Sequence, residues 1–283
     1  MAVISTITTG SDARGLFPDS SFLKPDEVIP DSLALNELFA TQTGEITGDS
    51  PKMRVPFVSA DATAAIVKEG DDITPATPTL DEVAFNTVKF AILTKMSNEA
   101  FASNAATNLI SVSAQRAVTG AIDNLMLNNT ATEGQPTGLL NTTGISTVTE
   151  QISDNLDPLL DLLGTIGDEG GQPTALTMSF GTWAKLLKLK DSTKRGLVAD
   201  RVADAPTPSL FGVPVVLNQR TPADTILAVD SSVVFAAASQ IEVARDSSYY
   251  FGSDSTALRI TARVGFGVSF PERIGKVMLK TAA

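Results

Sequence analysis

One continuous stretch of the chain, residues 52–129, predicts a long two-stranded ribbon that leads directly into a long helix. The ribbon arms are residues 52–68 and 81–96, and a polar loop at 69–78 joins them. Apolar side chains occupy alternate positions of the second arm, which is the period of a strand: Val88, Phe90 and Ile92. A ribbon of this length cannot bury itself against one compact domain, so we expect neighbouring molecules to cover it.

From Ser97 to residue 129 the apolar period changes to three or four, which predicts a helix. Ser97 is a suitable N-cap, and Glu99 lies in the first turn, where the helix dipole favours an anion. About thirty residues at ~1.5 Å each form a rod of roughly 45–50 Å.

The composition excludes several classes of function. The chain has 283 residues, 43% of them hydrophobic, which is enough for a substantial folded core. It has no cysteine and no histidine, so disulfides, thiolate or imidazole metal sites and Ser-His or Cys-His catalysis are all excluded. No apolar run approaches eighteen residues, and we therefore expect no membrane segment.

The net charge of −11 is unevenly distributed. Residues 1–50 hold eight acidic residues against Arg14 and Lys24, a balance of −6. This acidity opposes non-specific nucleic-acid binding, which depends on lysine and arginine. The acidic segment is interpreted either as a solvated arm or as an extended arm that lies across a neighbouring subunit. A basic cluster between Lys185 and Arg201 could contact DNA or the acidic arm of another subunit, and we favour the second interpretation.

The middle of the chain alternates helices and strands, and this predicts a mixed α/β domain over residues 145–248. The helices are expected at residues 155–167, with Asp154 as N-cap and Pro158 in the first turn, and at 180–188. The strands are expected at residues 174–179, 213–217, 225–229 and 233–237.

Residues 258–270 form the clearest strand pattern, with apolar residues on one face and Arg259, Thr261 and Arg263 on the other. At ~3.3 Å per residue this strand is about 43 Å long. Gly265 and Gly267 permit a bend or a close backbone approach. Because this strand matches the long helix in length, we expect the two to pack together, with residues 145–248 inserted between them.

Four segments, in this order, resemble the tailed-phage major capsid protein family, which has the Hong Kong 97 fold. They are TKMSNEA at residues 94–100, QPTGLL at 135–140, LFGVPVV at 210–216 and the arginine-containing strand 259–270 before Pro271. The resemblance implies an α+β fold with five parts. These are an N-terminal arm (1–51), an extended E-loop ribbon (52–96), the P-domain spine helix and bridge (97–144), an A-domain (145–248) and the P-domain terminal strand (249–283).

By this resemblance the chain is a major capsid protein of a tailed double-stranded DNA bacteriophage, made in the host cytoplasm and located in the virion. It would form hexamers and pentamers of an icosahedral head that encloses DNA without binding it specifically, together with separate scaffolding, portal and cement proteins. The alternative with the same fold is an encapsulin-type nanocompartment shell. A soluble carboxylate-dependent enzyme is the alternative from another class.

The residues expected at contacts between subunits lie in the E-loop and the P-domain: Lys68, Glu69, Asp71, Asp72, Arg259, Arg263 and Glu272. Some members of the family link an E-loop lysine covalently to a P-domain asparagine of a neighbour with the help of a glutamate. By the resemblance Lys68 could be the donor and Glu272 the acid, but no asparagine follows Asn218. We therefore expect non-covalent contacts. We expect no cofactor and no metal, since acidic residues such as Asp71 and Asp72 at a loop tip are stable in solvent without a ligand.

Overall fold

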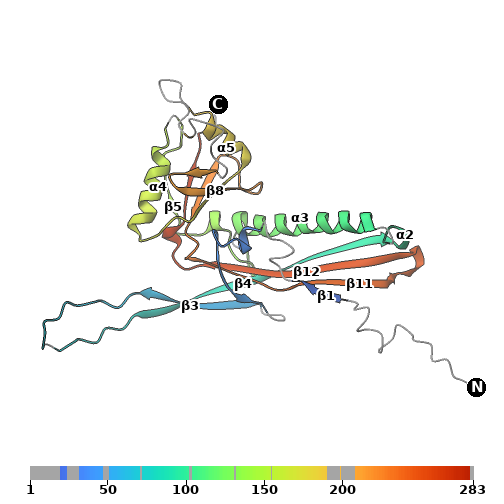
Figure 1. The fold of residues 1–283 in the computed structure, drawn as a ribbon, viewed down its shortest axis with the longest axis horizontal. Helices are drawn as coiled ribbons and strands as arrows, with labels where there is room; N and C mark the ends of the chain where they lie inside the picture. The colour runs from blue at the N-terminus through green and yellow to red at the C-terminus, as the bar shows by residue number, and fades with distance from the viewer. Residues whose placement is uncertain are drawn as a thin grey trace, which may run out of the picture.

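The computed structural model describes residues 20–23, 32–46, 51–70, 72–101, 104–130, 132–153, 155–189, 198 and 208–280. The molecule is elongated, with a long helix lying along a long sheet (Figure 1). A two-stranded ribbon projects from one end of this body, and a smaller α/β unit stands on the side of the helix near that end. None of the described helices is long and apolar enough to cross a membrane.

The long sheet has seven strands in the order β1-β11-β12-β10-β2, with β4 paired to β12 and β3 paired to β4. The strands are β1 (Ser20–Leu23), β2 (Thr41–Glu45), β3 (Lys52–Ala60), β4 (Thr79–Ser97), β10 (Val234–Ala238), β11 (Ile241–Tyr250) and β12 (Ser255–Val268). Among the described strands of this long sheet, only the β2–β10 pair is parallel. The long strand predicted near the C-terminus is therefore the centre of the sheet.

β4 is one strand of 19 residues that changes partner along its length. Its first half pairs with β3 up to Lys52↔Asn86, and its second half pairs with β12 from Gly265↔Thr87 to Ser255↔Ser97. β3 ends at Ala60, after a bulge, so the loop of the ribbon spans 61–78 rather than the predicted 69–78. The predicted first arm is too long for this reason.

The glycines of β12 allow another strand to come close. A Cβ added to Gly267 would lie 2.7 Å from Cδ1 of Phe85, and one added to Gly265 would lie 2.9 Å from the backbone oxygen of Asn86. Both distances are shorter than carbon atoms tolerate in a packed interior, so β4 could not cross β12 here if either residue carried a side chain.

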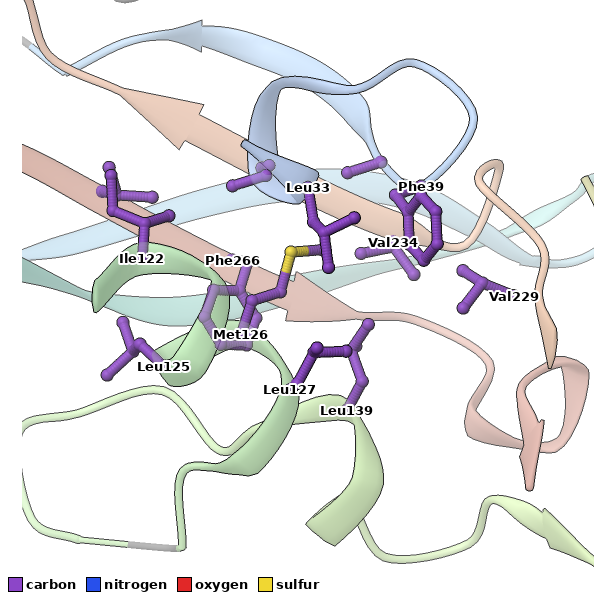
Figure 2. Packing of buried hydrophobic residues seen from close by; sticks show 14 of the residues in the cluster. Leu33, Phe39, Ile122, Leu125, Met126, Leu127, Leu139, Val229, Val234 and Phe266 are labelled. Atoms are coloured by element: carbon purple, nitrogen blue, oxygen red, sulfur yellow. The ribbon is translucent and has the colours of Figure 1, made fainter. Parts of the chain in front are cut away.

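The long helix is present as α2 (Asn98–Phe101) and α3 (Asn104–Asn128). Ser97 is the last residue of β4 and directly precedes α2, and Glu99 lies in the first turn of α2. The C-terminal half of α3 packs on the sheet, where Ile122, Met126 and Phe266 are almost fully buried (Figure 2). This larger core also includes the short 3-10 helices η1 (Leu33–Leu35) and η2 (Leu139–Asn141). The expected packing of long helix against long strand is observed.

The smaller unit contains a six-stranded sheet in the order β5-β13-β9-β6-β8-β7 with two helices. Its elements are β5 (Ser146–Thr147), α4 (Asp157–Asp168), β6 (Ala175–Met178), α5 (Phe180–Leu187), β7 (Ser209–Leu210), β8 (Val213–Leu217), β9 (Thr225–Val229) and β13 (Gly275–Met278). A second core lies between α4, α5 and this sheet. Pro158 lies in the first turn of α4, as predicted. The prediction of Asp154 as the N-cap is wrong, because α4 begins later and its N-cap is Leu156; Asp154 itself is outside the described residues.

The pairing of strands divides the chain differently from a simple insertion of residues 145–248. β10 and β11 fall within that range, yet both pair with β12 in the long sheet. β13 follows β12 in sequence, yet it pairs with β5 and β9 in the small sheet. The chain passes from the small sheet to the long sheet between β9 and β10, and it returns to the small sheet at η4 (Pro271–Arg273), between β12 and β13.

Candidate inter-subunit surfaces

Of the ribbon formed by β3, β4 and the 61–78 loop, the loop is covered by no other described residue, whereas the strand part packs on the body, where the ring centre of Phe57 lies 5.3 Å from that of Phe270. None of the described residues from 51 to 84 is buried. Several of its exposed side chains are large and apolar, which is unusual on a free surface: Val58, Ile66, Ile73 and Leu80. Ile66 is fully exposed and Ile73 is 81% exposed. The ribbon therefore presents apolar surface without a partner in the same chain.

The charged residues predicted for this loop lie at its solvent-exposed end. Lys68, Glu69 and Asp72 are all exposed, and Asp71 lies outside the described residues. Arg54 and Glu82 form an ion pair across the two arms, and about half or more of each side chain is exposed to solvent. This pair holds the register of the ribbon but adds little stability, as is usual for exposed pairs.

Arg259 and Arg263 lie on the face of the long sheet opposite α3. Nη2 of Arg259 is 3.2 Å from Oε1 of Glu242 on β11, so its nearest carboxylate belongs to the same chain. Nη1 of Arg263 donates to Oγ1 of Thr87 at 3.3 Å. The β4 residue directly opposite Arg263 is the exposed Lys89, and these two positive charges repel each other. This face is therefore locally basic on an acidic chain.

Glu272 lies in η4, at the turn between β12 and β13. Its backbone oxygen accepts a hydrogen bond from Oγ of Ser146 at 2.8 Å, and its side chain is partly exposed. Within one chain the ribbon points away from the body of the molecule, so the loop residues Lys68 and Glu69 are not brought to Arg259, Arg263 or Glu272 (Figure 1).

A shallow groove of about 580 Å³ lies at the end of the long sheet farthest from the ribbon. Its lining combines two cationic, one acidic and several small or apolar side chains: Leu93, Ala244, Arg245, Asp246, Ser247, Ser248, Tyr249, Ala257 and Arg259. Nζ of Lys95 lies 4.9 Å from the ring centre of Tyr250 beside it. The sequence pattern did not predict this groove, because β11 loses its apolar alternation after Val243.

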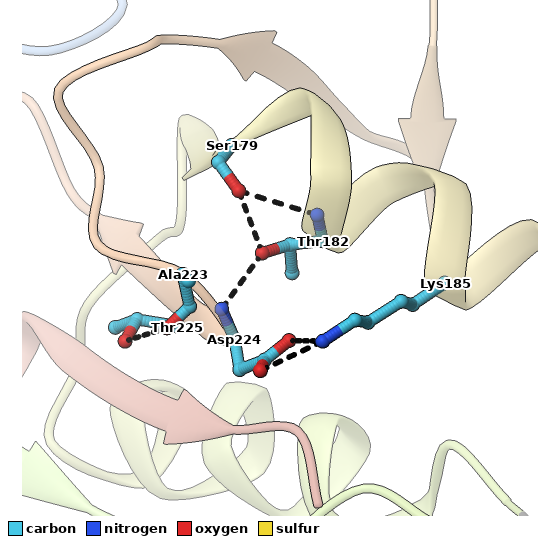
Figure 3. A network of polar contacts seen from close by, with 6 residues as sticks. All are labelled: Ser179, Thr182, Lys185, Ala223, Asp224 and Thr225. Carbon is cyan, nitrogen blue, oxygen red and sulfur yellow. Dashed lines mark hydrogen bonds and ion pairs between the residues drawn. The ribbon is translucent and has the colours of Figure 1, made fainter. Parts of the chain in front are cut away.

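The predicted basic cluster of the small unit is partly neutralised within the chain. Nζ of Lys185 contacts both carboxylate oxygens of Asp224, at 2.6 and 2.8 Å (Figure 3). The backbone N–H of Asp224 donates to Oγ1 of Thr182, which is linked to Ser179 at the N-cap of α5. The remaining members of the cluster lie outside the described residues, apart from the exposed Lys188.

No group of three acidic side chains close enough to hold a metal ion occurs among the described residues. The features described so far are thus a long free ribbon, a basic sheet face and a shallow groove, all of which suit contacts between large surfaces.

A model of the phage capsid family matches residues 26–278. The chain belongs to the phage capsid family. The prediction of a phage major capsid protein with an α+β capsid fold is confirmed, and the encapsulin-type alternative is not favoured. The chain is a structural capsid protein and a component of the virion.

Solved capsid structures share this fold at low sequence identity. The capsid of an empty GTA particle superposes with a TM-score of 0.69 at 19% identity, covering 88% of this chain and 91% of that one. A structure from Microbacterium phage Oxtober96 gives 0.68 at 16% identity, covering 98% and 100%. One from Gordonia phage Cozz gives 0.67 at 17% identity, covering 93% and 88%. No curated protein sequence matches the chain.

Proposed function

We propose that this capsid protein is the repeating subunit of an icosahedral head, assembled in the host cytoplasm as hexamers and pentamers around double-stranded DNA. In each contact the ribbon of one copy, formed by β3, β4 and the 61–78 loop, lies on the long sheet of the next copy. The observation that carries this proposal is the exposed apolar surface of the ribbon, with Ile66 and Ile73 its most exposed members.

The direction of the ribbon supports a head-to-tail contact. The ribbon leaves one end of the body, whereas β12, which carries Arg259 and Arg263, lies within the body (Figure 1). A surface on one end that binds a different surface on the next copy generates a ring when the rotation closes. Hexamers and pentamers are rings of this kind. Burying an isoleucine contributes about 1.5–3 kcal/mol, and each ring repeats this contribution at every contact.

Charge supports the same arrangement. The described end of the 61–78 loop carries Glu69 and Asp72 beside Lys68, and the receiving sheet face carries Lys89 opposite Arg263. Acidic groups from a neighbour would relieve the repulsion between these two cations. The net charge of −11 makes the shell wall repel packaged DNA, so DNA is enclosed without being bound specifically.

The family resemblance supports a division into an N-terminal arm, E-loop, P-domain and A-domain. On the strand pairing observed here, we assign β10, β11 and β12 with α3 to the P-domain, and β5 to β9 with β13 to the A-domain. Lys68, Glu69, Asp71, Asp72, Arg259, Arg263 and Glu272 remain the proposed contact residues. Separate scaffolding, portal and cement proteins complete the proposed assembly.

Assembly of a double variant, Ile66→Ser with Ile73→Ser, tests the role of the ribbon. We expect its thermal unfolding as a free subunit to match that of the unchanged chain, because neither side chain contacts its own core. The yield of assembled particles, measured by light scattering and negative-stain microscopy, should fall at least tenfold. This is the fall expected when about 1.4 kcal/mol or more is lost at each contact.

Leu160→Ser is the matched control, because Leu160 is an exposed apolar residue on α4 and not part of the ribbon. It should assemble normally. Particles formed at the normal yield by the double variant would contradict the proposed ribbon contact.

A further inference from the structure

Asp123 is a buried acidic residue of α3 at the point where three segments of the chain meet. Only 3% of it is exposed. Its Oδ1 accepts hydrogen bonds from the backbone N–H of Leu33 at 2.8 Å and from Oγ of Ser32 at 3.2 Å. Its Oδ2 accepts one from Nδ2 of Asn218 at 2.7 Å. One carboxylate therefore joins the segment before η1, the long helix and the loop between β8 and β9.

The 218–220 loop of the small sheet lies along α3 at two further positions. A Cβ on Gly120 would lie 2.7 Å from Nη2 of Arg220, so the guanidinium group rests directly on the helix backbone. Nδ2 of Asn128 donates to the backbone oxygen of Arg220 at 2.8 Å. Residues 120, 123 and 128 lie on the same side of the helix, because residues three or four positions apart are neighbours on a helix surface. The loop therefore follows this side of α3 for about two turns.

The negative charge of Asp123 is stabilised by hydrogen bonds and not by a cation in direct contact. No ion pair within 4 Å involves Asp123 among the described residues. Among the described residues, the charge of Arg220 acts on it through space. Burial raises the pKa of Asp123 above its ordinary value of 3.8, and the hydrogen bonds from Asn218, Leu33 and Ser32 and the charge of Arg220 offset this only in part.

We propose that Asp123 is a proton-linked latch that fastens the 218–220 loop of the small sheet and the 32–33 segment to α3, and that it holds more firmly when it takes up a proton. Of its three donors, the Ser32 hydroxyl is the one that can rotate and accept a hydrogen bond instead. A proton on Oδ1 can therefore point at Ser32 while Leu33 and Asn218 keep their contacts.

The direction of the pH effect follows from linkage. When the 218–220 loop separates from α3, water reaches Asp123 and the pKa of its carboxyl returns towards the ordinary value. The closed latch therefore binds a proton more tightly than the open one. Its stabilisation by the proton is fully present below the ordinary pKa of 3.8 and is lost as the pH rises through the raised pKa. Near neutral pH the closed latch carries a buried charge and opens more often.

Hydrogen–deuterium exchange of the full chain, measured from about pH 4 to pH 8 and corrected for the intrinsic rate at each pH, tests this proposal. The reporters are the backbone N–H groups of Leu33, which donates to Asp123, and of Arg220, which donates to Oδ1 of Asn218. We expect their protection in the unchanged chain to fall as the pH rises. In Asp123→Asn, where no proton is exchanged, this fall should disappear.

The Asp123→Asn substitution replaces one carboxylate oxygen by an amide N–H₂ group. This group either lies opposite Nδ2 of Asn218 or replaces the acceptor of the Leu33 N–H. Protection at neutral pH should therefore fall about tenfold at one of the two reporters. Asp161→Asn is the matched control, since Asp161 is an exposed carboxylate on α4, and its pH profile should equal that of the unchanged chain.

If Asp123→Asn does not fold, Asn218→Ala provides the same test. It removes the donor to Oδ2 and also the acceptor of the Arg220 N–H, so the Leu33 N–H is the reporter in this variant, and its protection should keep its dependence on pH. Protection that is independent of pH in the unchanged chain would overturn the proposal, and so would a pH dependence that persists in Asp123→Asn. Each readout is taken on the same assembly state, so it does not depend on head formation.

Discussion

At the scale of single residues, polar side chains that are buried and paired within one chain differ from polar side chains that are exposed and that we propose contact a neighbour. Asp224 belongs to the first group, because it is 8% exposed, contacts Lys185 with both oxygens and has a backbone φ of 58°. The left-handed backbone at this position suits aspartate better than most other residues. Lys68 and Glu69, by contrast, are exposed to solvent.

Lys185→Met should destabilise the small unit by about 1 kcal/mol. The substitution keeps most of the apolar length of the side chain, but it removes the charged partner of a buried carboxylate. Chemical denaturation of the unassembled chain measures this loss. Lys280→Met is the control, because Lys280 is an exposed lysine that follows β13 of the same small unit. It should change the free energy of unfolding only slightly. Equal losses in the two variants would show that Asp224 gains nothing from Lys185.

At the scale of elements, β4 connects the exposed ribbon to the packed sheet within one unbroken strand. Phe85 lies at the change of partner and is 5% exposed, and the glycines of β12 lie directly against its ring. Phe85 forms a third small core with Ile46 and Ala237, which fixes the base of the ribbon.

Phe85→Ala should destabilise the folded chain by about 3–5 kcal/mol, because it leaves a cavity and glycine has no side chain to fill it. Limited proteolysis should then cut the ribbon at its base more rapidly. Leu80→Ala, on the exposed part of the same strand, should change the free energy of unfolding by less than about 0.5 kcal/mol. A Phe85→Ala chain as stable as Leu80→Ala would mean that the base of the ribbon is not anchored there.

The elements that could be predicted from the sequence are those in which burial in the core of the same chain fixes the pattern of apolar residues. β8 and β9 occupy the predicted residues 213–217 and 225–229, since both are apolar strands bounded by turn residues, β9 buried throughout and β8 half-buried. β11 was missed because residues 245–249 are exposed on both faces and carry no alternation. The pairing of Arg259 with Glu242 could not be predicted either, because it depends on the register between β11 and β12, which is set by their long-range contacts.

At the scale of the whole molecule, two cores and a free ribbon have different roles. The larger core joins α3 to the long sheet and also includes Leu227 and Val229 of the small sheet, so the two units share apolar contacts. The described ribbon contributes no buried residue before Phe85. The cores that stabilise one chain and the exposed loop that we propose contacts the next chain are therefore separate parts of the molecule.

Assembled particles that are boiled in detergent should release single chains rather than a ladder of linked subunits. A covalent link between a lysine and an asparagine needs the side-chain amide of an asparagine near the lysine of a neighbour. Lys68 is exposed and able to act as a donor, and Glu272 is partly exposed, but no asparagine follows Asn218 in the sequence. The terminal strand β12 and the segment after it therefore offer no acceptor to a neighbouring ribbon.

Denaturing electrophoresis of purified particles measures directly whether subunits are linked. The control is Lys68→Arg, which keeps the charge but removes the amine. Bands at multiples of 29.6 kDa that vanish in Lys68→Arg would reveal an acceptor elsewhere in the chain and contradict non-covalent assembly.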